Sequence, residues 1–285
     1  MAKTWFITGT SSGFGRQLVE QVLERGDRVA ATARRTESLD DLAAAYGDRL
    51  WRASLDVTDT PRTREVVAKA FDDLGRIDVV VSNAGYGLFG AAEEVSDEQL
   101  DRQVATNLLA PIHLARAVIP RLRAQGGGRI VQVSSVGGLI AFPAMSLYHA
   151  TKWGIEGFWE STAADIAGFD IGVTLVEPGV ARTGFGGPSA DMGTPLAAYD
   201  DAPPGHLRRM LSGELPPMDA PGDPAKIARA IVDSVDHTPA PKRLTLGSDA
   251  YALATTALRE RLSALEAARD VAYSTDADDY DAAPR

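Results

Sequence analysis

A tyrosine and a lysine four residues apart, Tyr148 and Lys152, are the side chains whose spacing most clearly indicates chemistry. On a helix, residues i and i+4 share one face, so the phenol and the ammonium can act on one small volume. A free tyrosine has a pKa of about 10, and a cation about 4 Å away can lower that pKa by up to about 3. The pair predicts a tyrosine acid or base. A serine hydroxyl would hold the carbonyl oxygen that receives the proton, and we assign this role to Ser135 rather than Ser134.

A glycine-rich segment near the N-terminus follows a β-branched run and precedes a helical pattern. Glycines let the backbone approach a pyrophosphate, and a helix N-terminus offers free N–H groups to the anion. The spacing is G-x-x-x-G-x-G, so an ordinary glycine turn is the alternative, but the strand before it and the helix after it favour a dinucleotide. The residues expected to contact the cofactor here are Gly9, Thr10, Ser11, Ser12, Gly13, Phe14 and Gly15.

The segment after the second expected strand indicates which dinucleotide binds. An NAD enzyme usually places a carboxylate there for the ribose 2′-hydroxyl, whereas this chain has Arg34 and Arg35, and Glu37 comes too late. Guanidinium groups suit a 2′-phosphate, so the sequence favours NADP(H), with a solvated arginine pair as the alternative.

Two further strand ends are expected to reach the nucleotide. Asp56 and Val57 follow the third strand and would face the adenine, and Asn83-Ala84-Gly85 follows the fourth and would lie near the ribose. Residues of these types are also common in strand-end turns, which is the alternative for both.

The elements that must position these groups alternate between strand and helix patterns, which predicts an α/β fold: a Rossmann-like, doubly wound parallel sheet. Six strands are expected over 4–8, 28–33, 50–55, 77–81, 129–133 and 171–176, with helices over 13–25, 61–74, 97–123 and 148–167. Residues 183–222, rich in Gly, Pro, Asp and Met, are expected to form a substrate lid with helical periodicity only around 206–211. A C-terminal extension follows, with a helix over 223–235, a strand over 243–246 and a helix over 250–272. We expect one domain over 1–285, with a frayed tail over 274–285.

Composition excludes several functional classes. Lys plus Arg is 29 and Asp plus Glu is 39, a net charge of −10 that disfavours a nucleic-acid partner. There are no cysteines, so disulfides, thiolate metal sites and thiol nucleophiles are excluded, and we expect no metal. The sequence has neither an apolar run of about 20 residues nor a signal peptide, so we expect a full-length cytoplasmic protein without a membrane partner.

His149 lies one position off the Tyr–Lys face, so we interpret it as a neighbour rather than a base.

The chain resembles the short-chain dehydrogenase/reductase family along almost its whole length, and in particular the subgroup of 17β-hydroxysteroid and retinol dehydrogenases. The matching residues are Thr8-Gly9-x-x-x-Gly13-x-Gly15, Asp56, Asn83-Ala84-Gly85, Asn107, Ser135, Tyr148-x-x-x-Lys152, and Pro178-Gly179 with Thr183. The resemblance implies that Asn107 holds a proton-relay water to Lys152, and that Tyr148 and Lys152 also contact the cofactor. It further implies that Pro178, Gly179, Val180 and Thr183 lie at the nicotinamide, and that the protein is a homodimer or homotetramer. Ser82 departs from the family's common Asn-Asn-Ala-Gly.

The expected activity is hydride transfer between NADP(H) and a carbonyl or secondary alcohol of a largely hydrophobic small molecule. Residues expected to wall the site are mostly apolar: Tyr86, Leu88, Phe89, Leu139, Phe142, Met145, Phe185, Met192, Leu196, Tyr199, Leu207 and Met210. An epimerase or dehydratase on the same scaffold and a non-catalytic nucleotide-sensing regulator are the alternatives. Net consumption of reduced cofactor distinguishes the three.

Overall fold

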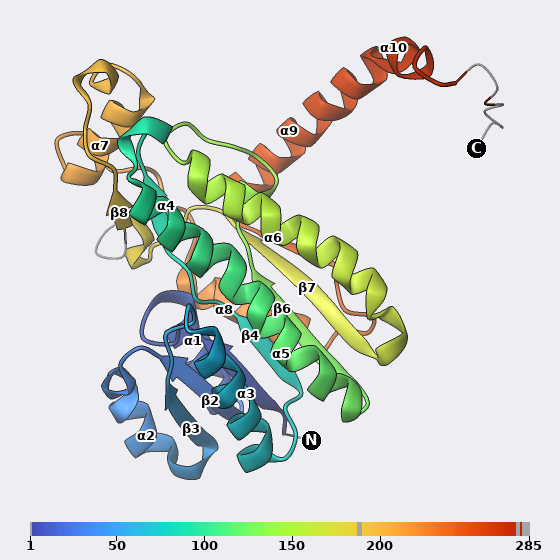
Figure 1. Ribbon diagram of the computed structural model, residues 1–285. Helices are drawn as coiled ribbons and strands as arrows, with labels where there is room; N and C mark the ends of the chain where they lie inside the picture. Colours follow the sequence, from blue (N-terminus) through green and yellow to red (C-terminus); the bar gives the residue numbers. More distant parts are fainter. Residues whose placement is uncertain (1, 187–189, 278–279, 281–285) are drawn as a thin grey trace.

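Seven parallel strands form the central sheet of the computed structural model, which describes residues 2–186, 190–277 and 280. Their order is β3-β2-β1-β4-β6-β7-β9 (Figure 1). The strands are β1 (Thr4–Thr8), β2 (Arg28–Ala33), β3 (Leu50–Ser54), β4 (Val79–Ser82), β6 (Gly128–Val133), β7 (Ile171–Pro178) and β9 (Arg243–Leu246). The predicted Rossmann-like, doubly wound sheet is confirmed.

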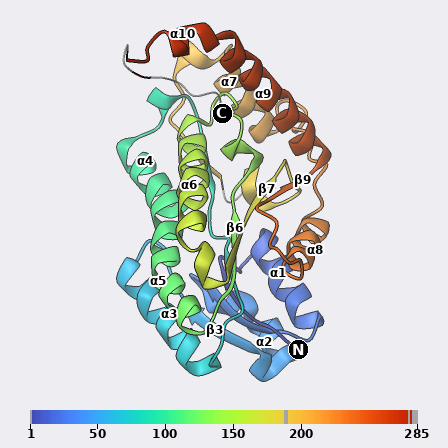
Figure 2. The ribbon, with the colours of Figure 1, turned by 90° about the vertical axis from the view of Figure 1, so that its right-hand side faces the viewer.

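Helices cover both faces of the sheet because successive strand residues point to opposite sides (Figures 1 and 2). Trp5 and Ile7 pack with α1 (Gly13–Glu24), α8 (Pro224–Ser234) and the short α2 (Asp40–Tyr46). Phe6, between them, packs on the other face. The helices on that face are α3 (Thr60–Leu74), α5 (Ala110–Ala124) and α6 (Ser146–Asp165). Burial on both faces explains why these strands are continuous apolar runs.

The direction in which successive strands are added to the sheet reverses between β1 and β4. This switch point is where a ligand is expected to bind. The chain runs outward from β1 through β2 to β3, then returns to place β4 on the other side of β1. The register pairs Thr8 with Thr32 and Ile7 with Val81, so the carboxyl ends of β1, β2 and β4 lie side by side. Ligands of open α/β sheets bind outside the carboxyl ends at such a switch point.

The long helix predicted over 97–123 contains one irregular turn. It comprises α4 (Asp97–Val104), a π-helical turn (Ala105–Leu109) and α5. A π turn widens the backbone by one residue and often occurs at functional sites. The helical periodicity predicted the helix but not the turn, and it did not predict α2.

The segment after β7 is more ordered than its composition suggests. It contributes β8 (Ala190–Met192), which pairs in parallel with β5 (Gly87–Phe89), and α7 (Pro203–Ser212). Buried Glu94 accepts hydrogen bonds from the Leu196 backbone N and Arg208 Nη1, both at 3.0 Å. These contacts with the body of the protein are long-range, so local periodicity does not show them. Residues 187–189 of the predicted lid lie outside the described residues.

The C-terminal extension leaves β9 and forms α9 (Ser248–Ala267) and α10 (Arg269–Tyr273), which project from the sheet (Figure 1). The predicted helix over 250–272 therefore comprises two helices. Of the predicted frayed tail, residues 278–279 and 281–285 lie outside the described residues. No helix in the described part of the chain combines the length and apolar character needed to cross a bilayer.

Candidate active site

Ser135, Tyr148 and Lys152 meet at the carboxyl end of the sheet. Ser135 follows β6, and α6 begins at Ser146, which places Tyr148 in its first turn and Lys152 one turn later. Tyr148 is 5% exposed and Lys152 is 7% exposed. Lys152 Nζ lies 5.6 Å from the centroid of the Tyr148 ring and donates a hydrogen bond to Val133 O at 3.2 Å. The structure thus brings the three predicted side chains together.

Burial shifts the pKa values of both Tyr148 and Lys152. It raises the pKa of Tyr148 to about 12, and hydrogen bonding to Ser135 lowers that pKa by less. Burial also lowers the pKa of Lys152 to about 8, against the charge of Glu156. The predicted lowering of the Tyr148 pKa is therefore wrong for this structure, because burial of the phenol raises its pKa by more than the hydrogen bond with Ser135 lowers it. At neutral pH the phenol holds its proton and can donate it.

Asn107 lies in the π-helical turn, which packs against α6, and it is 2% exposed. Its Oδ1 accepts from the Tyr86 backbone N at 3.1 Å, and its Nδ2 donates to Tyr86 O at 2.9 Å. The side-chain amide therefore fixes the backbone just after Gly85. The relay role implied by the family resemblance stays a prediction.

The glycine-rich segment forms a cradle in which side chains do not fit. A Cβ on Gly15 would lie 2.2 Å from Gly9 O and 2.6 Å from Asn83 Nδ2. Gly9 has φ +69°, a backbone conformation that favours glycine, and a Cβ on it would lie 2.8 Å from Ala84 Cα. These glycines keep β1, β4 and α1 in close contact.

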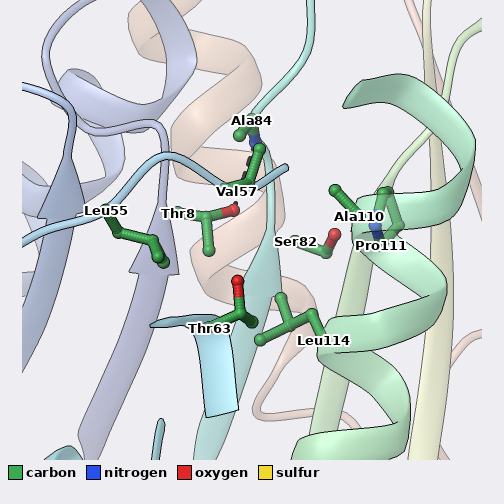
Figure 3. Close-up of a pocket in the computed structure, with 9 residues that line it drawn as sticks. All are labelled: Thr8, Leu55, Val57, Thr63, Ser82, Ala84, Ala110, Pro111 and Leu114. Carbon is green, nitrogen blue, oxygen red and sulfur yellow. Dashed lines mark hydrogen bonds between the residues drawn. The ribbon is translucent and has the colours of Figure 1, made fainter. Parts of the chain in front are cut away.

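The ends of β1 and β4 are joined by hydrogen bonds beneath this cradle. The backbone N atoms of Asn83 and Ala84 donate to Thr8 Oγ1 at 3.0 and 3.2 Å. Asn83 Nδ2 donates to Thr8 O at 2.9 Å and to Gly9 O at 3.1 Å. Figure 3 shows Thr8, Val57 and Ala84 around a small pocket bordered by residues of α3 and α5. The Asn83 side chain thus holds the backbone, and its expected contact with a ribose stays a prediction.

The N-terminus of α1 fits a pyrophosphate. Among the described residues no side chain caps this helix, and its first turn lacks an acidic residue. Ser11 and Ser12 are exposed at its entrance. Free N–H groups and the helix dipole attract an anion there, and the absence of side chains at the glycines lets it approach. The residues present therefore fit a bound dinucleotide.

Arg34 and Arg35 lie at the end of β2, where both are exposed. Within the described ranges neither guanidinium pairs with a carboxylate, whereas neighbouring Arg16 pairs with Asp41. Asp56 accepts hydrogen bonds from Thr58 N at 3.0 Å and Thr58 Oγ1 at 2.7 Å. These bonds lower the pKa of Asp56, with a smaller contribution from the charge of Arg34. The two arginines remain available to a phosphate.

The segment after β7 faces the cradle from the opposite side. The Thr183 side chain lies 3.9 Å from the position of a Cβ on Gly13. Val180 N donates to Asp249 Oδ2 at 2.7 Å, and a Cβ on Gly179 would lie 2.3 Å from the same carboxylate. Asp249, in the first turn of α9, therefore sets the backbone of the predicted nicotinamide segment. Sequence reasoning missed it, although an aspartate two residues after Gly247 at a helix start was an available signal.

A second group missed from the sequence is a buried ion network behind Lys152. Arg243 Nη1 contacts Glu156 Oε2 at 2.6 Å and also pairs with Glu177. The Glu177 side chain is 0% exposed and that of Glu156 is 6% exposed. Glu156 lies one turn after Lys152 on α6, so this network connects the lysine to β7 and β9.

Aromatic residues form the wall above Tyr148. The Phe185 ring lies 5.3 Å from the Tyr148 ring and 6.0 Å from the Phe89 ring, centroid to centroid. Met192 and Leu196, also predicted to wall the site, are 36% and 38% exposed. No group of metal-ligating side chains occurs in the parts of the chain that the structure describes.

Comparison with known proteins places this arrangement in a family. The family model of the short chain dehydrogenases matches residues 3–192. "Oxidoreductase BOA17" of Botryotinia fuckeliana is 38% identical over 254 residues, which cover 88% of this chain and 90% of that protein. A crystal structure of a short-chain dehydrogenase from Streptomyces avermitilis superposes with a TM-score of 0.90 at 41% identity, covering 97% of this chain and 100% of that one.

Two other solved structures hold nucleotides. ElxO with NADP bound has a TM-score of 0.71 at 25% identity, covering 86% of this chain and 97% of that one. A short chain dehydrogenase/reductase from Burkholderia phymatum in complex with NAD has a TM-score of 0.77 at 22% identity, covering 93% of this chain and 95% of that one, and shares the fold. The chain belongs to the short-chain dehydrogenase/reductase family and is an oxidoreductase.

Proposed function

We propose that the protein transfers a hydride between NADP(H) and the carbonyl or secondary alcohol of a largely hydrophobic small molecule. The observation that carries this proposal is the placement of Ser135, Tyr148 and Lys152 at the same sheet edge as the glycine cradle. The proton donor and the nucleotide site can then act on the oxygen and the carbon of one carbonyl group. The bound nicotinamide supplies or accepts the hydride.

The chain's own residues manage the proton. Ser135 donates its hydroxyl hydrogen to the substrate oxygen and holds it in place, because its Oγ already accepts from Gly137 N at 3.0 Å. Tyr148, protonated at neutral pH, gives its proton to that oxygen. Lys152 supplies positive charge beside the phenol that has lost its proton. Asn107, as the family resemblance implies, would hold a proton-relay water to Lys152.

The preference for NADP(H) over NAD(H) rests on Arg34 and Arg35. Their exposed guanidinium groups at the end of β2 suit a 2′-phosphate, and no carboxylate occupies that slot. The test titrates NADPH and NADH against the parent, the double variant Arg34→Ala plus Arg35→Ala, and the control Arg64→Ala on α3. We expect the double variant alone to lose NADPH affinity while keeping its NADH affinity. A parent that binds NADH more tightly contradicts this proposal.

A hydrophobic substrate is supported by the aromatic wall of Phe89 and Phe185 above Tyr148. A panel of ketones and alcohols of graded size and polarity, assayed with both cofactors, tests the substrate class and the reaction type together. Stoichiometric change in the absorbance of reduced cofactor is the expected result. Product formation without net cofactor change would instead indicate the epimerase or dehydratase, and cofactor binding without any product the nucleotide sensor.

Assembly as a homodimer or homotetramer is part of the proposal and is checked by light scattering of the purified protein. The support for it is the family resemblance. Cytoplasmic location stays a prediction from the sequence.

A further inference from the structure

His149 lies inside the Tyr–Lys motif, yet the proton transfer just described does not use it. It follows Tyr148 on α6 and is 4% exposed. Its ring points away from the Tyr–Lys face, toward the loop that joins Ser135 to the start of α6. There it contacts two backbone groups of that loop, Gly137 and Phe142.

The two contacts determine the state of the ring. Nδ1 lies 2.8 Å from Gly137 O, and a carbonyl oxygen only accepts, so Nδ1 must carry the hydrogen. Phe142 N donates to Nε2 at 2.8 Å, so Nε2 must be unprotonated. His149 is therefore neutral in one defined tautomer. A second proton on Nε2 would face the N–H of Phe142, and that hydrogen bond would be lost.

The surroundings of the ring favour the neutral form. Burial lowers the pKa of His149, and the hydrogen bond with Gly137 opposes this by less. From its own helix the ring meets Tyr148, at 5.7 Å between centroids, and from the loop it meets Phe142, at 5.5 Å. The 3-10 turn Val136–Gly138 brings no titratable side chain, and α9 packs on this turn through Ala250 and Ala254. Within the described ranges no charged side chain contributes to the pKa of His149.

The ring is coupled to the serine through one residue, Gly137. Gly137 N donates to Ser135 Oγ at 3.0 Å, and the carbonyl of the same residue is held by His149. A Cβ on Gly137 would lie 2.9 Å from the ring, so only glycine fits against it. The distance between the serine hydroxyl and the tyrosine hydroxyl therefore depends on a side chain of the tyrosine's own helical turn.

We propose that neutral His149 is a positioning residue that sets Ser135 against Tyr148, and that its protonation disables the site. This inference rests on the proposed oxidoreductase activity. Because the pKa of His149 is lowered, its neutral form prevails at neutral pH. Activity is therefore lost as the pH falls through the pKa of His149. Charging the ring breaks the bond from Phe142 N and releases the loop that carries the serine.

The test compares two substitutions at this position with the parent. Glutamine can donate to Gly137 O and accept from Phe142 N without titrating, so His149→Gln is expected to retain most of the parent kcat and to lack the acidic fall in kcat/KM. His149→Leu removes both bonds, and kcat is expected to fall by about ten- to hundredfold, as for a misplaced reacting group. The dissociation constant of NADPH should be unchanged in both. His206→Gln, at an exposed histidine of α7, is the control and should keep the parent pH profile.

Each outcome either supports or overturns the inference. The inference is overturned if kcat/KM of His149→Gln falls at acidic pH as it does in the parent. It is also overturned if His149→Leu keeps the kcat of the parent. If His149→Leu does not fold, the pH profile of His149→Gln decides alone. A parent that binds NADPH but turns over no carbonyl or alcohol refutes the proposed function instead, so the two failures are distinguishable.

Discussion

Gly15→Ala tests whether the cradle depends on the absence of a side chain. The added Cβ would lie 2.2 Å from Gly9 O and 2.6 Å from Asn83 Nδ2, both far inside van der Waals contact. Neither group can move freely, because Asn83 Nδ2 donates to Thr8 O at 2.9 Å and to Gly9 O at 3.1 Å. The substitution must therefore displace α1 from the strand ends or break these bonds.

The expected loss of stability in Gly15→Ala combines two effects. Overpacking costs about 1–3 kcal/mol and each lost neutral hydrogen bond about 0.5–1.5 kcal/mol, so the free energy of unfolding should fall by about 2–6 kcal/mol. Domains are stable by only about 5–15 kcal/mol, so the variant should unfold well below the parent in a thermal or urea melt. Because the displaced backbone is also the proposed pyrophosphate site, NADPH affinity should fall at least about tenfold, which corresponds to 1.4 kcal/mol.

Gly157→Ala is the matched control, since Gly157 is also helical and a Cβ there has no neighbour within 4 Å. Alanine in a helix is favoured over glycine by about 0.5–1 kcal/mol, so this variant should be slightly more stable than the parent. Parental stability and parental NADPH affinity in Gly15→Ala would refute the close packing described for the cradle.

Two other predictions concern charge and backbone position. Burial lowers the pKa of Lys152 to about 8, so the positive charge beside the phenol is present below that pH and is lost above it. We therefore expect kcat for ketone reduction to decline as pH rises through about 8, and a flat profile across that range would contradict the role of the lysine. Asp249→Ala removes the acceptor of Val180 N, 2.7 Å away, and should raise the KM for the nicotinamide cofactor by about three- to tenfold, a loss of about 1 kcal/mol. Parental steady-state constants in Asp249→Ala would show that the carboxylate does not hold this segment.

The elements that the sequence predicted well are those whose pattern is local. Runs such as Thr4–Thr8 and Arg28–Ala33 lie between two helical layers, so they are continuous apolar segments with clear ends. The tyrosine and lysine were equally predictable, because a spacing of four on a helix fixes their common face. The pairing of β5 with β8 was missed because these strands have three residues each and are about a hundred positions apart.

The remaining features of the site depend on tertiary contacts. The spacing of Tyr148 and Lys152 shows that they are close but not that both are buried, so the direction of the tyrosine pKa was predicted wrongly. His149 and Asp249 act on backbone groups of other segments, and neither partner follows from the local sequence. Whether Arg34 and Arg35 are free to bind a phosphate likewise depends on which arginines the nearby carboxylates pair with, and the local sequence does not show this.

In the proposed reaction the Tyr148 hydroxyl transfers the proton while a bound nucleotide exchanges the hydride. Tyr148→Phe removes only that hydroxyl, and its kcat with an accepted carbonyl and its NADPH dissociation constant should be measured on one preparation, beside Tyr251→Phe as a surface control. We expect kcat to fall by about 10²–10⁴-fold in Tyr148→Phe with cofactor binding unchanged, and Tyr251→Phe to behave as the parent. Turnover by Tyr148→Phe within about tenfold of the parent would contradict this expectation.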